Sequence, residues 1–407
     1  MNTKKHIYFL LFSIAVFLFI AGCANKEQGE AALELNDISL EAYQAELLDI
    51  AFESVSAMPA FPHIKNRSRA QEAVVQVCLE LEQPKRALGY IEQIENWNQQ
   101  LSYAELAFYC AENNYSKKDI EHFLDMAKQI PEDIQDWQRD RIKVNIAQTY
   151  AYIGNREKSD EYEKGIEISE SGKVARIHAM NSSSETFDKQ IESIDALIAT
   201  EEFDIVKNAV IAYIELYKCN YEDINRREIV EEKIKASYAN FPINIKIELL
   251  MELADSCLSH ENTTEALRFV NEAKSIMNSA SWQSRFVIPI MAQLAKLSYL
   301  SGEKETALSE LQKAIDLYQE NLDKIVDIYK AGVLRPIAEA SVVMDDKNFT
   351  LDIYKKAIEA GVENPNSRPR AEDLSATCCS MAQNRFEPDQ ELLNRIKEIQ
   401  GNLGDPW

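Results

Sequence analysis

The sequence predicts an all-α protein, built as an α-solenoid of antiparallel helix pairs. Three observations support this prediction. Glycine and proline together make up 22 of 407 residues, roughly 5%, against about 12% in average proteins. No stretch alternates polar and apolar residues for long enough to form a sheet. Small or apolar residues recur at a fixed spacing of 12 and then 7 along most of the chain.

This spacing is typical of a helical hairpin. A step of 12 residues crosses one helix, a tight turn and the start of a second helix, and a step of 7 is two turns on one face. Gly154 and Gly302 fall midway through their steps, where a helix end needs a left-handed residue. The sets are Val75, Ala87 and Ile94; Ala147, Ser159 and Ile166; Ala254, Ala266 and Ala273; Ala295, Ala307 and Ala314; and Ala338, Thr350 and Ala357.

The expected elements follow from this periodicity. We expect one helix over about 38–57, ended by Pro59 and Pro62, and a loop at Gly361, Pro365 and Pro369 before the last pair. The segment from Ser182 to Thr200 is either a joint between two halves or an irregular repeat. We expect one continuous solenoid over 38–400 and a tail over 401–407 whose Trp407 frays, packs on the last helix or serves as a docking tag. Helix pairs are expected over about 66–96, 100–129, 137–170, 173–200, 203–239, 243–278, 282–319, 321–360 and 371–400.

At these positions the chain resembles the tetratricopeptide repeat family. The best match is Asn145 to Tyr150 followed by Gly154 and Ser159, and Leu294-Ala295 and Leu253-Ala254 begin two more matches. The leading Trp and the closing Pro of the family pattern are missing. Successive small residues in the C-terminal part lie 41 and 43 residues apart, against about 34 in the family, which implies longer C-terminal repeats.

The first residues read as an export signal. Lys4 and Lys5 precede an apolar run from Ile7 to Ile20, which is long enough for a signal-peptide core and short for a membrane span. The run ends in Ile20-Ala21-Gly22-Cys23, which resembles the lipobox of bacterial lipoproteins. The resemblance implies removal of residues 1–22, lipid attachment to the Cys23 thiol and a polar tether over 23–37. The alternative is an uncleaved N-terminal anchor with an incidental cysteine.

This resemblance also implies where the protein is found. A lipoprotein is held in the cell membrane by its lipid, because two or more acyl chains anchor a protein stably. No Asp follows Cys23, so in a cell with two membranes the outer membrane is implied, with the protein on its periplasmic or surface side. The net charge of −23 disfavours a nucleic-acid partner, since phosphate binding needs surplus lysine and arginine.

Motifs that would indicate an enzyme are absent from the sequence. Its eleven glycines make no nucleotide-binding loop, and it has no G-x-S-x-G, no H-E-x-x-H and no EF-hand pattern. We therefore expect no catalytic residues, no metal site and no cofactor. Asp133, Asp136 and Asp140 share a helix face, which we interpret as solvated rather than as a metal or acid/base site. A disulfide between Cys78 and Cys110 is an open alternative to two buried thiols.

The leading functional hypothesis is a non-enzymatic protein–protein interaction scaffold in the bacterial envelope, because solenoids bind extended partners on a concave face. An envelope protein is the expected partner. The alternative is a glycan-binding lipoprotein of a nutrient-uptake system. An α/α-toroid enzyme is a third class, disfavoured by the scarcity of glycine. The residues expected on the concave face follow the small residues of the first helices: Gln76, Tyr109, Gln148, Tyr152, Asp255, Lys296, Tyr299 and Glu339.

Overall fold

The computed structural model describes residues 35–166, 187–239 and 241–407, and this part of the chain is helical with no strand. The lipobox and the signal segment lie outside the described residues. The helices are α1 (Ala42–Ser56), α2 (Ala60–Glu80), α3 (Pro84–Ile91), α4 (Asn98–Glu112), α5 (Lys117–Ala127), α6 (Asp136–Tyr152), α7 (Arg156–Glu163), α9 (Phe187–Ile198), α10 (Phe203–Cys219), α11 (Ile224–Tyr238), α12 (Ile243–Ser259), α13 (Thr263–Asn278), α14 (Ser284–Leu300), α15 (Lys304–Glu320), the 3-10 turn η1 (Leu322–Lys324), α16 (Asp327–Val343), α17 (Lys347–Val362), α18 (Ser367–Gln383) and α19 (Gln390–Gly401).

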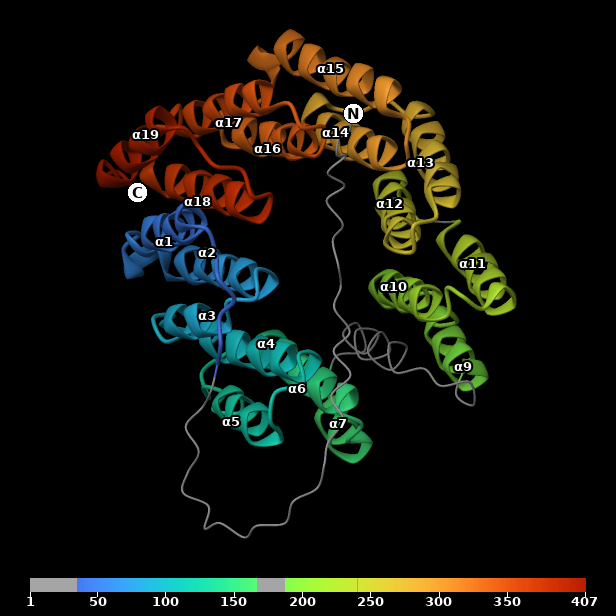
Figure 1. Cartoon of the computed structure of the whole chain (residues 1–407). Coiled ribbons are helices and arrows are strands. Elements are labelled where there is room, and N and C mark those ends of the chain that lie inside the picture. The colour runs from blue at the N-terminus through green and yellow to red at the C-terminus, as the bar shows by residue number, and fades with distance from the viewer. Residues whose placement is uncertain (1–34, 167–186, 240) are drawn as a thin grey trace, which may run out of the picture. The chain divides into compact units, whose positions relative to one another are not determined.

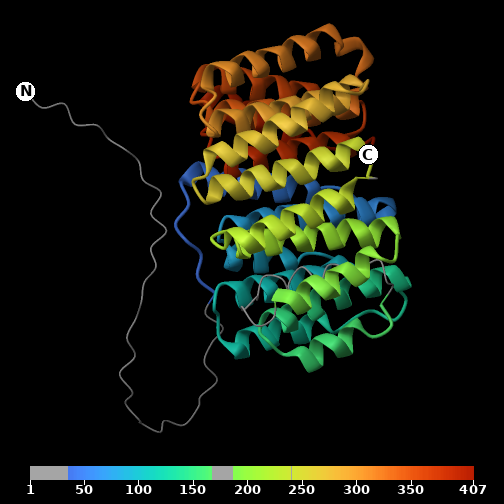
Figure 2. The same ribbon diagram turned by 90° about the vertical axis from the view of Figure 1, so that its right-hand side faces the viewer.

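Most of the helices form the predicted antiparallel pairs, which confirms the all-α solenoid (Figures 1 and 2). Of the pair expected over 173–200, residues 173–186 lie outside the described residues, and α9 packs on α10. The residues at the 12-then-7 spacing are buried, except Ile166, which is half-buried beyond the end of α7. In one pair the Ser159 hydroxyl donates to the Ala147 carbonyl at 3.1 Å, and in another Ser341 and Thr350 share a hydrogen bond of 2.8 Å. The C-terminal pairs from α12 to α17 have helices of 16 or 17 residues, as the longer spacing predicts.

Left-handed residues end the first helix of most pairs. Gly154 and Gly302 have φ of 76° and 100°, as predicted. Four other pairs place a residue with a Cβ there, among them Glu82 and Glu261 with φ of 54° and 57°. A glycine is therefore not required at this turn, although a residue with a Cβ adopts this conformation at an energetic cost.

The first helices of the pairs pack side by side in one layer. In space the order of this first-helix layer is α10, α12, α14, α16, α18, α2, α4 and α6, each in contact with the next (Figure 1). The second helices α11, α13, α15, α17, α1, α3, α5 and α7 pack on it as a second layer. The layer thus passes from the C-terminal part of the chain to the N-terminal part without interruption.

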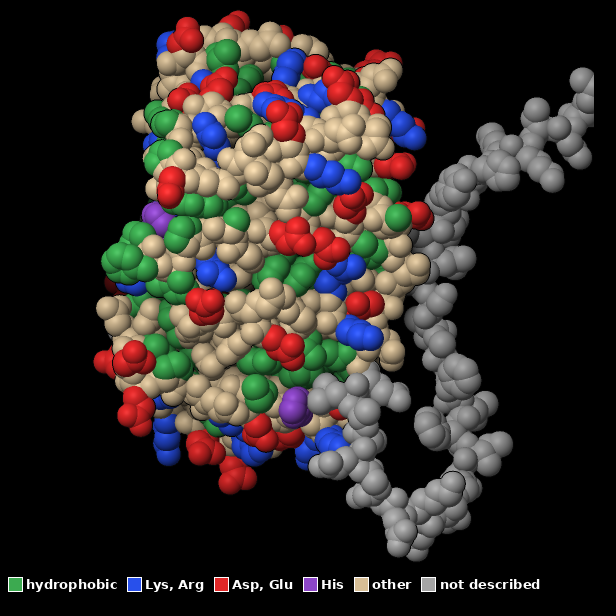
Figure 3. All heavy atoms as spheres, turned by 90° about the vertical axis from the view of Figure 1, so that its left-hand side faces the viewer, with side chains coloured by type: hydrophobic (Ala, Val, Ile, Leu, Met, Phe, Trp, Pro, Cys, Tyr) green, Lys and Arg blue, Asp and Glu red, His purple; other side chains and the backbone are tan. Residues whose placement is uncertain are grey.

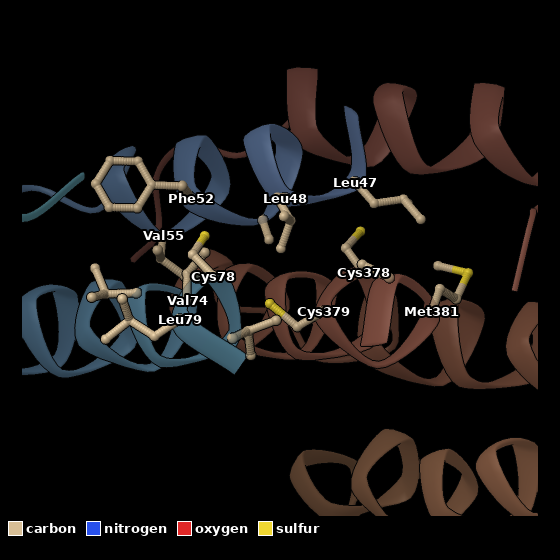
Figure 4. Close-up of a cluster of buried hydrophobic side chains, with 14 of the residues drawn as sticks. Leu47, Leu48, Phe52, Val55, Val74, Cys78, Leu79, Cys378, Cys379 and Met381 are labelled. Carbon is tan, nitrogen blue, oxygen red and sulfur yellow. The ribbon is translucent and has the colours of Figure 1, made fainter. Parts of the chain in front are cut away.

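The contact between α18 and α1 makes this continuity, and the sequence did not predict it. We expected α18 and α19 to form the last pair. Instead α18 packs far more extensively against α1 than against α19, so the first helix of the structure takes the place of a second helix for α18. Figure 4 shows Leu47, Leu48 and Phe52 of α1 facing Cys378 and Met381 of α18 and Val74 and Cys78 of α2. We call this contact the terminal joint.

Polar contacts fix the register of the terminal joint. Buried Gln44 of α1 donates from Nε2 to the Ala382 carbonyl of α18 at 2.8 Å. Helix α19 lies against α17 and α1, where Arg395 pairs with Glu359 and Lys397 pairs with Glu46. The C-terminal tail is also held, because Ser367 donates its backbone N–H to the Pro406 carbonyl at 2.8 Å and Trp407 is half-buried against the core.

The described part of the chain begins at Leu35, three residues before the expected boundary of the solenoid at residue 38. Leu35 is buried in the core. The Asp37 carboxylate accepts the backbone N–H groups of Lys85 and Arg86, at 2.7 and 3.3 Å, and so caps the start of α3. The end of the predicted tether is therefore fixed beside the turn between α2 and α3.

Some predicted breaks and surfaces differ from the structure. Gly361 lies inside α17 rather than in a loop. It also lies close to α18, where an added Cβ would stand 3.1 Å from the Cβ of Asp373. Pro369 sits in the first turn of α18, where its missing N–H costs no helical hydrogen bond.

Asp140 of α6 is buried, so the expected solvated face of Asp133, Asp136 and Asp140 is wrong at its last member. Cys78 and Cys110 are both free and buried, so the alternative of two buried thiols holds.

On the face seen from the side of α19 and α1, acidic and basic side chains are interspersed (Figure 3). Several of these acids are paired across helices, as Arg86 of α3 pairs with Asp49 of α1. Such exposed pairs contribute at most about 1 kcal/mol each.

The terminal joint yields a first prediction. Leu48 is fully buried between α1, α2 and α18, so Leu48→Ala should cost about 2–5 kcal/mol of unfolding free energy. Because α1 covers α18, the backbone amides of 371–383 should also exchange faster with solvent. Leu250→Ala, at a fully buried position of α12, is the matched control and should leave those amides unchanged. Native-state hydrogen exchange checks this, and wild-type protection of 371–383 in Leu48→Ala would contradict the joint.

Candidate binding cleft

A cleft of about 850 Å³ opens on the first-helix layer over α2, α4 and α6. We call it the glutamate cleft. This size falls within the range of ordinary ligand sites. Its lining residues are Glu72, Gln76, Leu79, Glu80, Glu82, Glu105, Phe108, Tyr109, Glu112, Asn113, Arg141, Asn145 and Gln148.

Helical periodicity aligns these residues. On α4, Glu105, Tyr109 and Glu112 follow one another at steps of four and three, so they occupy one face. The same steps separate Arg141, Asn145 and Gln148 on α6. The opposite faces of these helices carry the apolar core, and small buried residues such as Ala104 and Ala107 let α4 lie close to its neighbours.

The floor of the cleft contains an ion pair between a buried glutamate and a half-exposed arginine. Glu72 of α2 is 7% exposed and accepts a hydrogen bond from the Asn98 amide at the start of α4. The Arg141 guanidinium of α6 lies 3.4 Å from the other carboxylate oxygen of Glu72. Burial raises the pKa of Glu72, and Arg141 and Asn98 act against this rise. The three helices are thus tied together by one carboxylate.

Glu105 of α4 lies beside this pair. Its Oε2 atom is shielded from solvent and has no hydrogen-bond partner. Burial, with a further contribution from the nearby charge of Glu72, raises the pKa of Glu105 to about 8, while Arg141 and a hydrogen bond with Gln76 act in the opposite direction. Glu105 is therefore mostly protonated at neutral pH. An acid perturbed in this way inside a cleft is a feature that functional sites share.

The rim of the cleft is exposed and carries more acid. Glu80, Glu82 and Glu112 are exposed, and Phe108 and Tyr109 are half-buried between them. In all, five glutamates face one arginine. The rim thus joins carboxylates with two aromatic rings, whose faces also attract cations.

Three of the eight residues predicted for the concave face line this cleft: Gln76, Tyr109 and Gln148. Tyr152 lies next to it, with its ring 5.5 Å from that of Phe108. The other four are on the C-terminal part of the layer. Asp255 is exposed on α12, Lys296 and Tyr299 are half-buried on α14, and Glu339 on α16 accepts a hydrogen bond of 2.7 Å from Ser380 of α18.

The sequence reasoning missed the acidic floor. It assigned to the concave face the residues that follow the small positions. It left out Glu72, Glu105 and Arg141, which lie one or two turns earlier on the same helix faces. The helical spacing could have identified two of them, because Glu72 is four residues before Gln76 and Glu105 is four residues before Tyr109. What it could not show is that α2, α4 and α6 place these faces together.

In 35–166, 187–239 and 241–407 no group of three or more His, Cys, Asp or Glu is arranged to hold a metal ion. No helix within these ranges is long and apolar enough to cross a membrane.

Comparison with known proteins adds little. No protein-family model and no curated protein matches the chain. Among solved structures, it is similar to a circular tandem repeat protein with novel repeat topology and enhanced subunit contact surfaces, at 13% identity and a TM-score of 0.28. The match covers 89% of this chain and 94% of the other.

The raised pKa of Glu105 yields a second prediction. Between the ordinary carboxyl pKa of 4.5 and about 8, the folded protein holds a proton that the unfolded chain has lost, so wild-type stability falls as pH rises through this window. In Glu105→Gln the side chain cannot lose a proton, so this fall in stability with pH should disappear. The substitution should stabilise the protein by about 1–3 kcal/mol at pH 8 and change little at pH 4.5, as measured by urea unfolding. Exposed Glu305→Gln on α15 is the control, and an equal effect of Glu105→Gln at both pH values would contradict the assignment.

Proposed function

We propose that the protein is an exported, lipid-anchored scaffold that binds a partner protein of the bacterial envelope and catalyses no reaction. The fold is a helical repeat scaffold, which is compatible with a protein-interaction role. The observation that carries the proposal is the glutamate cleft, where three predicted contact residues from three successive first helices meet on one surface.

The groups in the cleft suit binding better than catalysis. Glu72 is engaged by Arg141 and Asn98, and the Oε2 atom of Glu105 is shielded from solvent. Neither carboxyl is thus offered to a reacting atom, as an acid or base must be. The amides and aromatic rings along the rim are the side chains that hydrogen-bond and pack against partners.

Membrane attachment is proposed from Cys23 and its lipobox. The buried Leu35 stands twelve positions after Cys23, and a fully extended chain of this length spans at most roughly 40 Å. Leu35 and Asp37 are fixed beside the turn that contains Glu82, which lines the cleft. The anchor would therefore hold the cleft near the membrane surface, where an envelope partner is met.

Lipidation is a third prediction. In cells supplied with an alkyne-tagged fatty acid, the wild-type protein should be labelled and should begin at Cys23. Cys23→Ser should abolish the label and leave residues 1–22 attached, as seen by intact mass. Cys219→Ser, on the exposed cysteine of α10, is the control and should stay labelled. An unlabelled wild type that keeps residues 1–22 would support the uncleaved anchor instead.

Partner capture is a fourth prediction. Crosslinking in native membranes should attach one envelope protein to the wild type, and Tyr109→Ala/Gln148→Ala in the cleft should lose it. Tyr299→Ala, on α14 outside the cleft, is the matched control and should keep the partner. Equal capture by both variants would remove the cleft from the proposal. If no protein is captured and soluble glycans bind, the glycan-binding lipoprotein becomes the better description.

A further inference from the structure

A second hollow lies on the described body, away from the glutamate cleft. It has a volume of about 340 Å³ and opens where α14 and α16 begin. We call it the α14 pocket, and its lining includes Trp282, Arg285, Lys324 and Val326. Trp282 is fixed in its place, because its indole Nε1 donates to the Met277 carbonyl at 2.8 Å. One wall of the pocket is therefore held in position before any ligand binds.

Large apolar side chains are exposed around the α14 pocket. Val326 in its lining is 59% exposed, and Phe286 and Tyr329, which flank Arg285, are 51% and 40% exposed. Apolar residues that are exposed singly are ordinary on a protein surface, but a group of them beside a pocket is typical of an interaction surface. The α14 pocket thus has an apolar surround that is open to solvent.

The charged side chains of the pocket are both cations. Arg285 and Lys324 line it, and no acid does. Within the described residues neither side chain forms an ion pair, and Lys324 donates instead to the Asn321 side-chain oxygen at 3.1 Å. Of the neighbouring acids, Asp323 lies outside the lining, and Asp327 is paired with a lysine of its own helix at 2.9 Å. The lining is therefore positively charged on a protein whose net charge is −23.

Aromatic rings hold the Arg285 side chain. Its guanidinium carbon lies 4.5 Å from the centre of the Phe286 ring and 4.6 Å from that of the Tyr329 ring. Such stacking covers the faces of a guanidinium and leaves the N–H groups at its edge available. The Nε atom is shielded from solvent, so the two Nη atoms are the donors that a ligand can reach. A guanidinium fixed in this way loses little freedom when it binds a carboxylate.

The α14 pocket and the first described residues lie at opposite ends of the first helices. The first helices run parallel, because Arg335 and Glu339 of α16 contact Asp373 and Ser380 of α18 in the same order, and a hydrogen bond joins the last turns of α18 and α2. Asp37 binds at the turn after α2, whereas the pocket lies where α14 and α16 begin. A lipid anchor that joins the body near Asp37 would bring the other end of the helices, not this pocket, to the membrane.

We infer that the α14 pocket binds a segment of a partner protein in which an aspartate or glutamate stands next to an apolar side chain. The carboxylate accepts hydrogen bonds from Arg285 and Lys324, and the apolar side chain packs against Trp282 and Val326. Charge complementarity selects an acidic segment, and the exposed apolar surround selects its neighbour. This surface is additional to the glutamate cleft, so the inference goes beyond the proposed function.

The test is peptide binding by the full-length protein in detergent, measured by fluorescence anisotropy. The probe is a fluorescent octapeptide with two Phe-Asp steps between Gly-Ser ends. One comparison peptide has Asn in place of each Asp, and the other has Ala in place of each Phe. We expect each comparison peptide to bind about tenfold more weakly than the probe. No binding of the probe at about 1 mM, or equal binding of the probe and either comparison peptide, would overturn the inference.

A matched pair of charge variants locates the site. Arg285→Gln/Lys324→Gln removes two positive charges from the pocket, and Lys304→Gln/Lys313→Gln removes two from exposed positions of α15. The first variant should weaken probe binding about tenfold, and the second by less than about twofold. If both variants weaken binding alike, the attraction depends only on net charge and the inference fails.

A second matched pair tests the apolar contact. Val326→Ser shortens an exposed side chain of the pocket, and Leu308→Ser makes a similar change at a 48% exposed position of α15. Because both side chains are exposed, both variants should keep the fold. Val326→Ser should weaken probe binding about threefold, and Leu308→Ser should leave it unchanged. Equal binding by the two variants would overturn the apolar contact and the inference with it.

Two further measurements identify other occupants. Dihexanoylphosphatidylglycerol, a short-chain anionic lipid, should not displace the probe, and displacement at a lower concentration than unlabelled probe requires would assign the pocket to a lipid surface. In sedimentation, the wild type and Arg285→Gln/Lys324→Gln should have the same mass. A wild-type dimer that this variant dissociates would assign the pocket to a second copy of the chain. Either of these results overturns the inference.

Failure of this inference can be distinguished from failure of the proposed function. If Tyr109→Ala/Gln148→Ala loses an envelope partner but the Phe-Asp probe does not bind, the scaffold stands and the inference about the α14 pocket fails. If the probe binds and Arg285→Gln/Lys324→Gln loses it, but no partner is captured from membranes, the chemistry of the pocket stands and the proposed role in the envelope fails.

Discussion

The burial of α1 against α18 is the contact on which the rest of the structure depends. In a solenoid each helix pair contacts only its neighbours, so a break anywhere separates the two sides. Leu47 and Leu48 of α1 fill the space between α18 and α2, and Gln44 fixes their register through the Ala382 carbonyl. The N-terminal pairs thereby continue the layer that the C-terminal pairs begin. Without this joint the cleft on α2, α4 and α6 would belong to a short terminal stack.

The cleft carries an energetic cost that the rest of the fold avoids. Arg141 and Asn98 offset the cost of burying Glu72, and Glu105 holds its proton because burial, with a smaller contribution from the charge of Glu72, raises its pKa. A hydrophobic floor would be more stable. Carboxyls retained at such a cost are better explained by what they bind than by what they stabilise.

The first described residues lie beside the cleft. Asp37 caps α3 and Leu35 enters the core, so the chain that would lead from a lipid on Cys23 arrives at one fixed place. That place adjoins Glu82, at the rim. The lipid anchor proposed for Cys23 would therefore join the described body beside the cleft.

Spacings within about 40 residues predict most of the helices, most of their pairs and the buried small residues, because these features depend on local periodicity. The sequence also placed Gln76, Tyr109 and Gln148 on the right faces of their helices. Only the tertiary structure decided that α1 completes α18, that Gly361 lies within a helix, and that Glu72, Glu105 and Arg141 share one floor. Contacts between residues about 340 positions apart, as between Gln44 and Ala382, leave no periodic trace in a single sequence.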